Sequence, residues 1–130
     1  MAGLNVRFDG GNKANEKIVQ MVREGKAVPV CPEQLAGFCT PRERIELRNG
    51  RAFTESGKDV TRQLVKGAEE TLKIARLANA GVAIFKSRSP SCGSGRIYDG
   101  SFSGKLVEGN GIAAEFLQKS GIRVLTEEKI

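Results

Sequence analysis

One short stretch constrains the fold of this chain more than any other: the seven residues Ser89–Gly95, which follow the apolar run Val82–Phe85. The apolar run predicts a buried strand. A stretch of Ser, Pro, Cys and Gly adds little to a hydrophobic core, but it can bend the backbone sharply and direct amides and the Cys92 thiol towards one point. Because open α/β sheets bind ligands at the carboxyl ends of their strands, we predict a ligand site around Cys92.

The remaining patterns predict an α/β fold around that strand. They indicate helices over 14–24, 60–79 and 110–119, strands over 27–31 and 122–125, and a surface loop over 97–106. A β-hairpin is predicted over 45–54, because Asn49-Gly50 stands between two alternating runs. A helix followed by a strand is typical of a crossover unit. We therefore predict that residues 1–130 form one domain, a small Rossmann-like three-layer α/β fold with a mostly parallel sheet and the hairpin.

Length and composition narrow the class of protein. The chain has no run of 18 or more apolar residues and no basic-then-apolar leader pattern, so we predict no membrane span and a cytoplasmic location. Its three cysteines do not have the spacing of a disulfide framework and are expected to be free thiols, metal ligands or nucleophiles. The chain has no histidine, so proton transfer must depend on carboxylates, hydroxyls, lysines or thiols.

Two of the cysteines, Cys31 and Cys92, each come at or after the end of a predicted strand. The first of these strands contains Pro29, which cannot donate to a ladder, so we expect that strand at an edge or kinked. If the two strands are parallel neighbours, about 4.8 Å apart, both thiols lie at one sheet edge and could ligate one iron–sulfur cluster. The alternative, a small buried apolar Cys, is favoured for Cys39 but not for these two, which have Pro and Gly neighbours.

Three polar side chains near these cysteines are candidates for proton transfer or substrate binding. Glu33 follows Cys31 closely and could act as a general base, although a carboxylate in the first turn of a helix is also favourable for the helix dipole alone. Ser89 and Ser91 flank Pro90 and could orient a substrate or relay a proton. The pattern by itself favours loop capping for both serines.

Charge and composition leave two other function classes open. A net charge of +6 could favour an anionic partner such as RNA, although an ordinary basic surface is the commoner explanation. Aromatic residues make up 5% of the chain and none is Trp, which argues against a stacking platform for single strands. A thiol redox protein that uses Cys31 and Cys39 is the weakest alternative, because the chain has no C-x-x-C motif.

Five motifs follow one another along the chain: Phe8–Lys13, Val28–Glu33, Thr40–Arg42, Gly57–Thr61 and Ser89–Gly100. In this order they resemble the small bacterial thiouracil desulfidase family, and the resemblance covers essentially the whole chain. The resemblance implies an enzyme with a 4Fe–4S cluster that converts thiouracil or a thiolated uridine to the oxo form and releases sulfide, without a redox step. The implied partners are a small thiolated pyrimidine and, as an alternative substrate, thiolated tRNA.

The resemblance also implies roles for individual residues. Cys31 and Cys92 would ligate the cluster, whose open iron acts as a Lewis acid on the thiocarbonyl sulfur. Glu33 and Ser89 would be the catalytic pair, with Ser91 as the alternative to Ser89. The substrate pocket would be lined by Asp9, Gly10 and Asn12.

One departure from the family pattern concerns the third cluster ligand. In the family this ligand is a Cys at the end of a first strand, and it would fall immediately before Met1. We therefore expect these 130 residues to lack the third Cys ligand and to bind the cluster poorly, with Cys39 as the alternative ligand. A missing strand would also expose sheet edges and favour oligomers. The alternative function is a nucleic-acid-binding or interaction module that retains the fold but binds no cluster.

Overall fold

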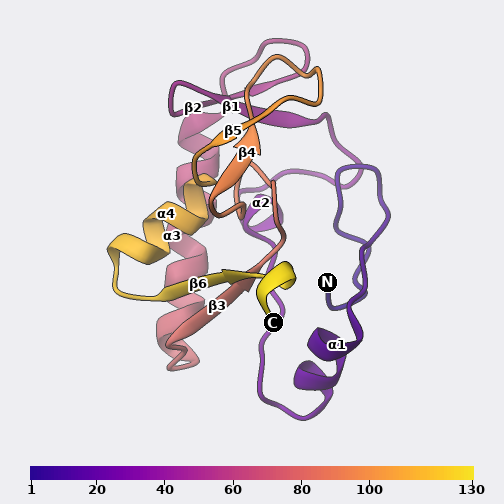
Figure 1. Cartoon of the computed structure of the whole chain (residues 1–130), viewed down its shortest axis with the longest axis vertical. Coiled ribbons are helices and arrows are strands. Elements are labelled where there is room, and N and C mark those ends of the chain that lie inside the picture. Colours follow the sequence, from indigo (N-terminus) through magenta and orange to yellow (C-terminus); the bar gives the residue numbers. More distant parts are fainter.

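The computed structural model describes all residues from Met1 to Ile130. The elements follow the order α1 (Glu16–Arg23), α2 (Pro32–Leu35), β1 (Ile45–Arg48), β2 (Arg51–Thr54), α3 (Thr61–Leu77), β3 (Val82–Phe85), β4 (Arg96–Tyr98), β5 (Leu106–Glu108), α4 (Ile112–Lys119), β6 (Arg123–Thr126) and the 3-10 helix η1 (Glu127–Lys129). In Figure 1, α3 and α4 lie to the left of β3 and β6, whereas α1 lies to the right. None of the helices is both long and apolar enough to cross a membrane.

The strands form three separate pairs. Strands β3 and β6 are parallel, with Val82 opposite Arg123. Strands β1 and β2 form an antiparallel hairpin, and Asn49 and Gly50 in its turn have positive φ angles of 52° and 76°. Strands β4 and β5 are also antiparallel. The predicted α/β class, with parallel strand pairing and an antiparallel hairpin at Asn49-Gly50, is confirmed.

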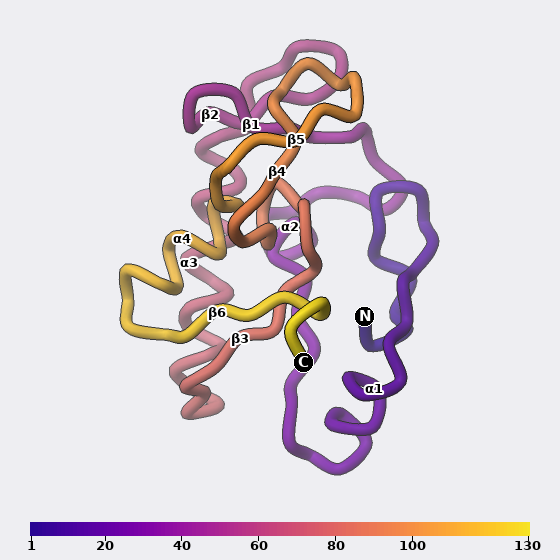
Figure 2. The backbone as a smooth tube through the Cα atoms, in the orientation of Figure 1, coloured from indigo at the N-terminus to yellow at the C-terminus, as the bar shows by residue number.

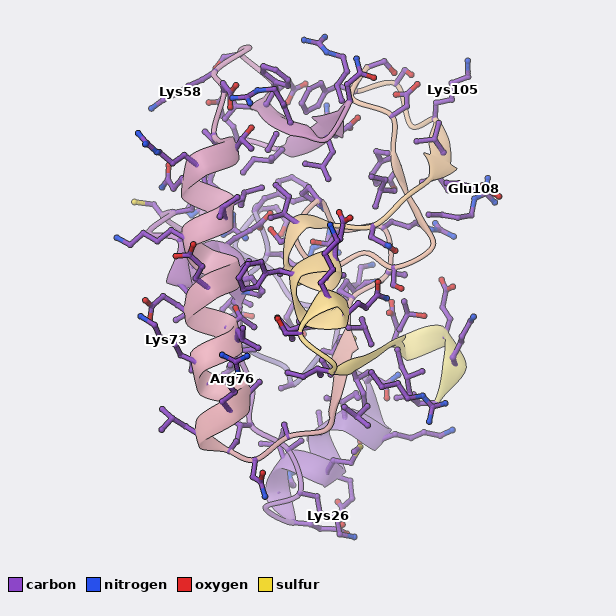
Figure 3. The ribbon with its side chains drawn as sticks, turned by 90° about the vertical axis from the view of Figure 1, so that its left-hand side faces the viewer. Lys26, Lys58, Lys73, Arg76, Lys105 and Glu108 are labelled. Carbon is purple, nitrogen blue, oxygen red and sulfur yellow. The ribbon has the colours of Figure 1, made fainter.

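Helix α3 belongs to both hydrophobic clusters of the core. In the first cluster, Ala68 and Leu72 of α3 pack with β3 and with the inner face of α4; in the second, Leu64 packs with the hairpin and β4. Figure 3 shows α3 running along much of the height of the molecule, with the shorter α4 beside its middle part. Full burial of a Leu side chain contributes about 1.5–3 kcal/mol. Helix α3 is therefore the element that joins the two halves of the core.

The short helix α2 rests on α3 at Gly67. A Cβ atom at Gly67 would lie 2.2 Å from the carbonyl oxygen of Pro32 and 2.8 Å from the Cβ of Ala36, so no larger residue fits unless α2 moves. An isolated helix of four residues has no stability of its own, so packing against α3 is what maintains α2. This contact fixes Cys31 and Glu33, at the first turn of α2, relative to the core.

The strand predicted over 27–31 does not form. Pro29 and Pro32 carry no N–H group that could donate to a neighbouring strand. Cys31 instead is the N-cap of α2, with the extended backbone angles φ −126° and ψ 107°. The strand prediction was wrong because Pro29, which was expected only to put the strand at an edge or to kink it, leaves this segment without regular pairing, and Pro32 begins α2 directly after it.

The three predicted helices are confirmed as α1, α3 and α4, but the segment 97–106 is only partly a loop. Its ends belong to β4 and β5, which pair with each other. The turn between them is held by the buried Glu46, whose Oε1 atom accepts hydrogen bonds from the backbone N–H groups of Gly100 and Phe102, each at 3.1 Å. A β1 side chain therefore anchors this ribbon, a long-range contact that local patterns do not reveal.

Candidate active site

The loop that carries Cys92 is wound into a tight turn around Ser89. The Ser89 Oγ accepts hydrogen bonds from the backbone N–H groups of Ser91, at 3.2 Å, and Cys92, at 3.1 Å. The Ser89 carbonyl accepts a third from the N–H of Gly93, at 2.7 Å. A Cβ atom at Gly93 would lie 2.6 Å from that carbonyl oxygen. The turn therefore needs glycine at this position.

The same loop closes the N-terminal end of α4. The first amides of a helix have no partner within it. Here the N–H of Ile112 donates to the Pro90 carbonyl at 2.9 Å, and those of Ala113 and Ala114 donate to the Ser91 carbonyl at 2.8 and 3.1 Å. The loop is thus held between β3 and α4, and the position of Cys92 is fixed with it.

Ser91 has the one buried side-chain polar atom without a hydrogen-bond partner, its Oγ. The residue is 2% exposed and packs against the backbone of Gly111, where an added Cβ would lie 2.5 Å from the Ser91 carbonyl carbon. A buried hydroxyl without a partner costs free energy. Its hydrogen-bonding capacity is unused within the protein.

The two thiols Cys31 and Cys92, which are far apart in the sequence, lie in one electrostatic neighbourhood. Burial raises the pKa of the Cys92 thiol well above its ordinary value, and the charges of Glu33 and Cys31 raise it further. A hydrogen bond from Ser89 and the positive amino terminus oppose this rise. A thiol with a raised pKa stays protonated at neutral pH, so a metal ion that binds it must displace the proton.

Glu33 is held by an ion pair with Arg42. The Arg42 Nε and Nη2 atoms lie 3.1 and 2.5 Å from the Glu33 Oε2. Both side chains are largely buried, with exposed fractions of 14% for Glu33 and 7% for Arg42. The pairing keeps a negative charge inside the site with a partner, as a buried carboxylate requires.

A second ion pair stands at the carboxyl ends of the parallel strands. Lys86 directly follows β3 and pairs with Glu127, which directly follows β6. Glu127 also accepts hydrogen bonds from Ser87, from its N–H at 2.8 Å and its Oγ at 2.9 Å. Burial raises the pKa of Glu127, but the hydrogen bonds from Lys86 and Ser87 outweigh it and bring the pKa below its ordinary value.

The amine of Met1 senses the charges of both this ion pair and the two thiols. Burial brings the pKa of the amine below its ordinary value, and the positive charge of Lys86 lowers it further. The charges of Glu127, Cys31 and Cys92 oppose this change. Lys86 and Glu127 were not among the residues predicted from the sequence. The signal was present, since each follows a strand and the carboxyl ends of parallel strands meet at one edge.

Asp9, Gly10 and Asn12 lie in a separate turn of the N-terminal segment. The Asp9 Oδ1 accepts a hydrogen bond from the N–H of Gly11 at 2.9 Å, and the Asn12 Nδ2 donates to the Asn5 Oδ1 at 2.7 Å. No hydrogen bond joins this turn directly to the thiols. Its link to the rest of the site is Arg42, and Figure 2 shows the segment running along the side of the molecule opposite α3.

Cys39 is exposed and stands apart from the other two cysteines. It lines a groove of about 340 Å³ together with Phe38 and Arg42. No three Cys, Asp or Glu side chains are placed together as metal ligands, so Cys39 does not complete a set with Cys31 and Cys92. Thiols suit an iron–sulfur cluster, and the chemistry of these two fits two of its ligand positions.

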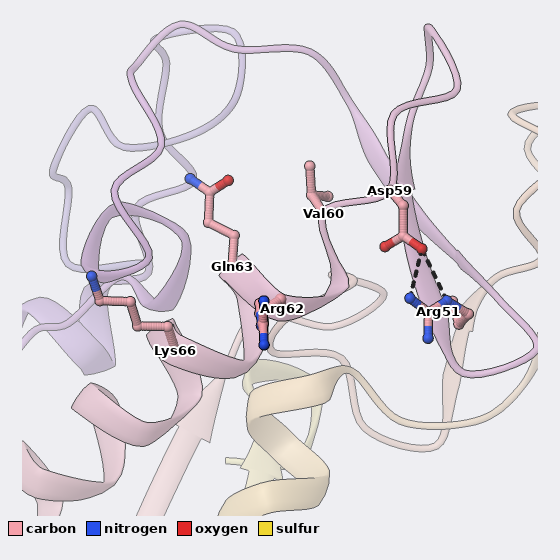
Figure 4. Close-up of a pocket in the computed structure, with 6 residues that line it drawn as sticks. All are labelled: Arg51, Asp59, Val60, Arg62, Gln63 and Lys66. Atoms are coloured by element: carbon pink, nitrogen blue, oxygen red, sulfur yellow. Dashed lines mark hydrogen bonds and ion pairs between the residues drawn. The ribbon is translucent and has the colours of Figure 1, made fainter.

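Another depression in the surface lies away from the thiols, at the start of α3. It measures about 520 Å³ and is lined by Arg51, Asp59, Val60, Arg62, Gln63 and Lys66 (Figure 4). Arg51 is paired with Asp59, with its Nη2 atom 2.7 Å from the carboxylate. None of the residues predicted for the site lines it, so it has no part in the thiol chemistry.

Two known proteins and one family model are similar to this chain. The uncharacterized protein YbbK of Bacillus subtilis (strain 168) is 44% identical over 140 aligned residues, which cover 100% of this chain and 93% of YbbK. The solved structure of the 4Fe–4S-dependent thiouracil desulfidase TudS matches with a TM-score of 0.93 and 38% identity, over 98% of this chain and 86% of TudS. The 2-thiouracil desulfurase family model matches residues 1–129. The chain therefore belongs to the 2-thiouracil desulfurase family.

Proposed function

We propose that this protein is an iron–sulfur-dependent desulfidase that converts a small thiolated pyrimidine, thiouracil or a thiolated uridine, to its oxo form. The family and the similar structure indicate thiouracil desulfidase chemistry. The observation that carries the proposal to this chain is the grouping of Cys31 and Glu33, from the first turn of α2, with Ser89 and Cys92, from the loop after β3.

The proposed roles follow from what each side chain can do where it lies. Cys31 and Cys92 would hold a 4Fe–4S cluster, which when bound supplies a Lewis-acidic iron for the thiocarbonyl sulfur. The Glu33 carboxylate would take a proton from the water that attacks the thiocarbonyl carbon. A carbon–oxygen bond forms, the carbon–sulfur bond breaks, and sulfur leaves as sulfide with no net electron transfer.

The two serines are proposed to act near that carbon. The Ser89 Oγ accepts hydrogen bonds from two backbone amides, and Ser89 lowers the pKa of the Cys92 thiol, which supports a role in orienting substrate or relaying a proton. Ser91 remains the alternative, because its hydroxyl has no partner within the protein. Asp9, Gly10 and Asn12 are proposed to border the substrate pocket, as the family resemblance implies.

Two wider proposals concern substrate and setting. We propose that residues 1–130 act as one desulfidase domain, and that the reducing cytoplasm, which three free thiols suit, is its compartment. Thiolated tRNA is the second candidate substrate. The net charge of +6 supports it, and the same charge, with Arg62 and Lys66 in the basic depression, supports the alternative of a cluster-free nucleic-acid-binding module.

The test uses a matched pair of cysteine variants after anaerobic reconstitution with iron and sulfide. We expect Cys92→Ala to lose bound iron and sulfide release from 2-thiouracil, because it removes a ligand, whereas Cys39→Ala keeps both. Iron, acid-labile sulfide and released sulfide are measured on each chain, and RNA binding is measured in parallel. If Cys92→Ala binds iron and releases sulfide as well as the unaltered chain does, the desulfidase proposal is wrong; RNA binding by an unaltered chain that takes up no iron would instead favour the module.

A further inference from the structure

The Arg42 side chain connects three separate segments of the chain. Besides its two hydrogen bonds to Glu33 in α2, its Nη1 atom donates to the Thr40 Oγ1 at 3.0 Å and to the Cys39 carbonyl at 3.3 Å. Its Nη2 atom also donates to the Val6 carbonyl in the N-terminal segment, at 2.9 Å. Every nitrogen of the guanidinium group is therefore bonded, in a side chain that is almost fully buried.

The bond to Glu33 is directed at one carboxylate oxygen only. Both Arg42 nitrogens that reach Glu33 bond to Oε2, and Oε1 accepts no hydrogen bond from the protein. Only one buried side-chain polar atom lacks a hydrogen-bond partner, and it is the Ser91 Oγ. The Glu33 Oε1, which also lacks a partner, is therefore not fully buried. The carboxylate is thus fixed by one oxygen, and the other remains open to a water molecule.

The backbone N–H of Arg42 also bonds to the N-terminal turn. Its N–H donates to the Phe8 carbonyl at 2.7 Å, directly before Asp9 and Gly10. With the Val6 bond, Arg42 therefore holds this turn from two sides. The position of the turn and that of the Glu33 carboxylate depend on one side chain and its own amide.

We propose that Arg42 is the positioning residue of this site, which fixes Glu33 through Oε2, presents Oε1 to water, and sets the N-terminal turn at a constant distance from that carboxylate. The inference rests on the proposed role of Glu33 as the base. Only arginine suits the task, since its planar fork makes several directed hydrogen bonds at once, whereas a lysine ammonium is a single point charge.

The first test compares Arg42→Lys with a matched variant two residues away. Arg44→Lys makes the same change in an exposed pair, where Arg44 bonds to both oxygens of Glu55 at 3.2 and 2.6 Å. We expect Arg42→Lys to lower kcat for sulfide release about 10–100-fold, as loss of an orienting partner does. Iron content should stay within about twofold, and Arg44→Lys should change neither kcat nor iron content. A kcat that is unchanged in Arg42→Lys overturns the inference.

The second test needs no cluster and no activity. Hydrogen–deuterium exchange is measured on the iron-free chain, and we expect Arg42→Lys to speed exchange in peptides from 1–13 and 31–37 but not in α3. If exchange is unchanged in 31–37, or rises equally in α3, Arg42 does not position Glu33 specifically. Should the unaltered chain release no sulfide, the desulfidase proposal fails, and this measurement still decides whether Arg42 holds Glu33.

Discussion

At the scale of single residues, the site contains two serines with opposite environments. The Ser89 Oγ satisfies two backbone amides of the loop, whereas the Ser91 Oγ satisfies nothing. Removal of a hydroxyl that is hydrogen-bonded and removal of one that is not should therefore change the free energy of unfolding differently. The sequence could not distinguish the two serines, because both flank Pro90 and the pattern predicts loop capping for both.

We predict opposite effects of the two alanine substitutions on stability. Ser89→Ala leaves two amides without a partner and should lower the free energy of unfolding by about 1–3 kcal/mol. Ser91→Ala removes an unpartnered buried hydroxyl and should be neutral or raise that free energy by about 1 kcal/mol. Denaturant unfolding of the iron-free chains measures both. If Ser91→Ala also abolishes sulfide release while Ser89→Ala does not, Ser91 is the catalytic serine.

The raised pKa of Cys92 predicts how stability changes with pH. In the unfolded chain this thiol ionises around its ordinary value of 9.0, whereas in the folded chain it stays neutral. Its contribution to stability is therefore fully present below pH 9 and is lost as the pH rises above it, by up to about 1.4 kcal/mol per pH unit.

The measurement compares unfolding of the iron-free chain and of Cys92→Ala at pH 8 and pH 10. The unaltered chain should lose more of its stability between these values than the variant does. An equal loss in both chains would mean that the folded protein does not hold this thiol neutral.

At the scale of elements, the site depends on the contact between α2 and α3. Substitution of Gly67 by alanine gains up to about 1 kcal/mol of helix propensity. The added Cβ would, however, lie 2.2 Å from the backbone of α2, a distance that forces α2 away from α3. The clash outweighs the propensity because it involves a carbonyl oxygen rather than the end of a flexible side chain.

We therefore predict that Gly67→Ala lowers the free energy of unfolding by about 1–3 kcal/mol, as overpacking does, and also weakens iron binding by displacing Cys31. Gly81→Ala is the control, since an added Cβ there meets nothing within 4 Å. Thermal unfolding and iron content are measured on both. A Gly67→Ala chain that matches the control would show that α2 adapts without cost.

The elements also show where sequence reasoning succeeded. The three helices and the Asn49-Gly50 hairpin depend on local signals, apolar spacing and turn chemistry, which the chain displays clearly. The strand predicted over 27–31 does not form because Pro29 interrupts its apolar residues and removes a donor that a strand needs. The β4–β5 ribbon was missed because its anchor, Glu46, lies far away in the sequence.

At the scale of the whole molecule, the site is assembled from four distant segments: the N-terminal turn, α2 with the loop to Arg42, the loop after β3, and the end of β6. The cysteines and Glu33 were identifiable as candidates because their local context is unusual. Lys86 and Glu127 follow strands and could have been considered, but the ion pairs that they and Arg42 form join segments far apart in the sequence, so the sequence does not identify the partners. Only the fold supplies that information.

The parallel pairing of β3 with β6 has a further consequence for how the protein matures in the cell. A ribosome makes the chain from its N-terminus, and β3 has no strand partner until residues 123–126 have been made. The Lys86–Glu127 pair likewise cannot form until residue 127 has been made. The carboxyl end of the parallel pair, with its ion pair, is therefore assembled only after α1 to α4 have been made.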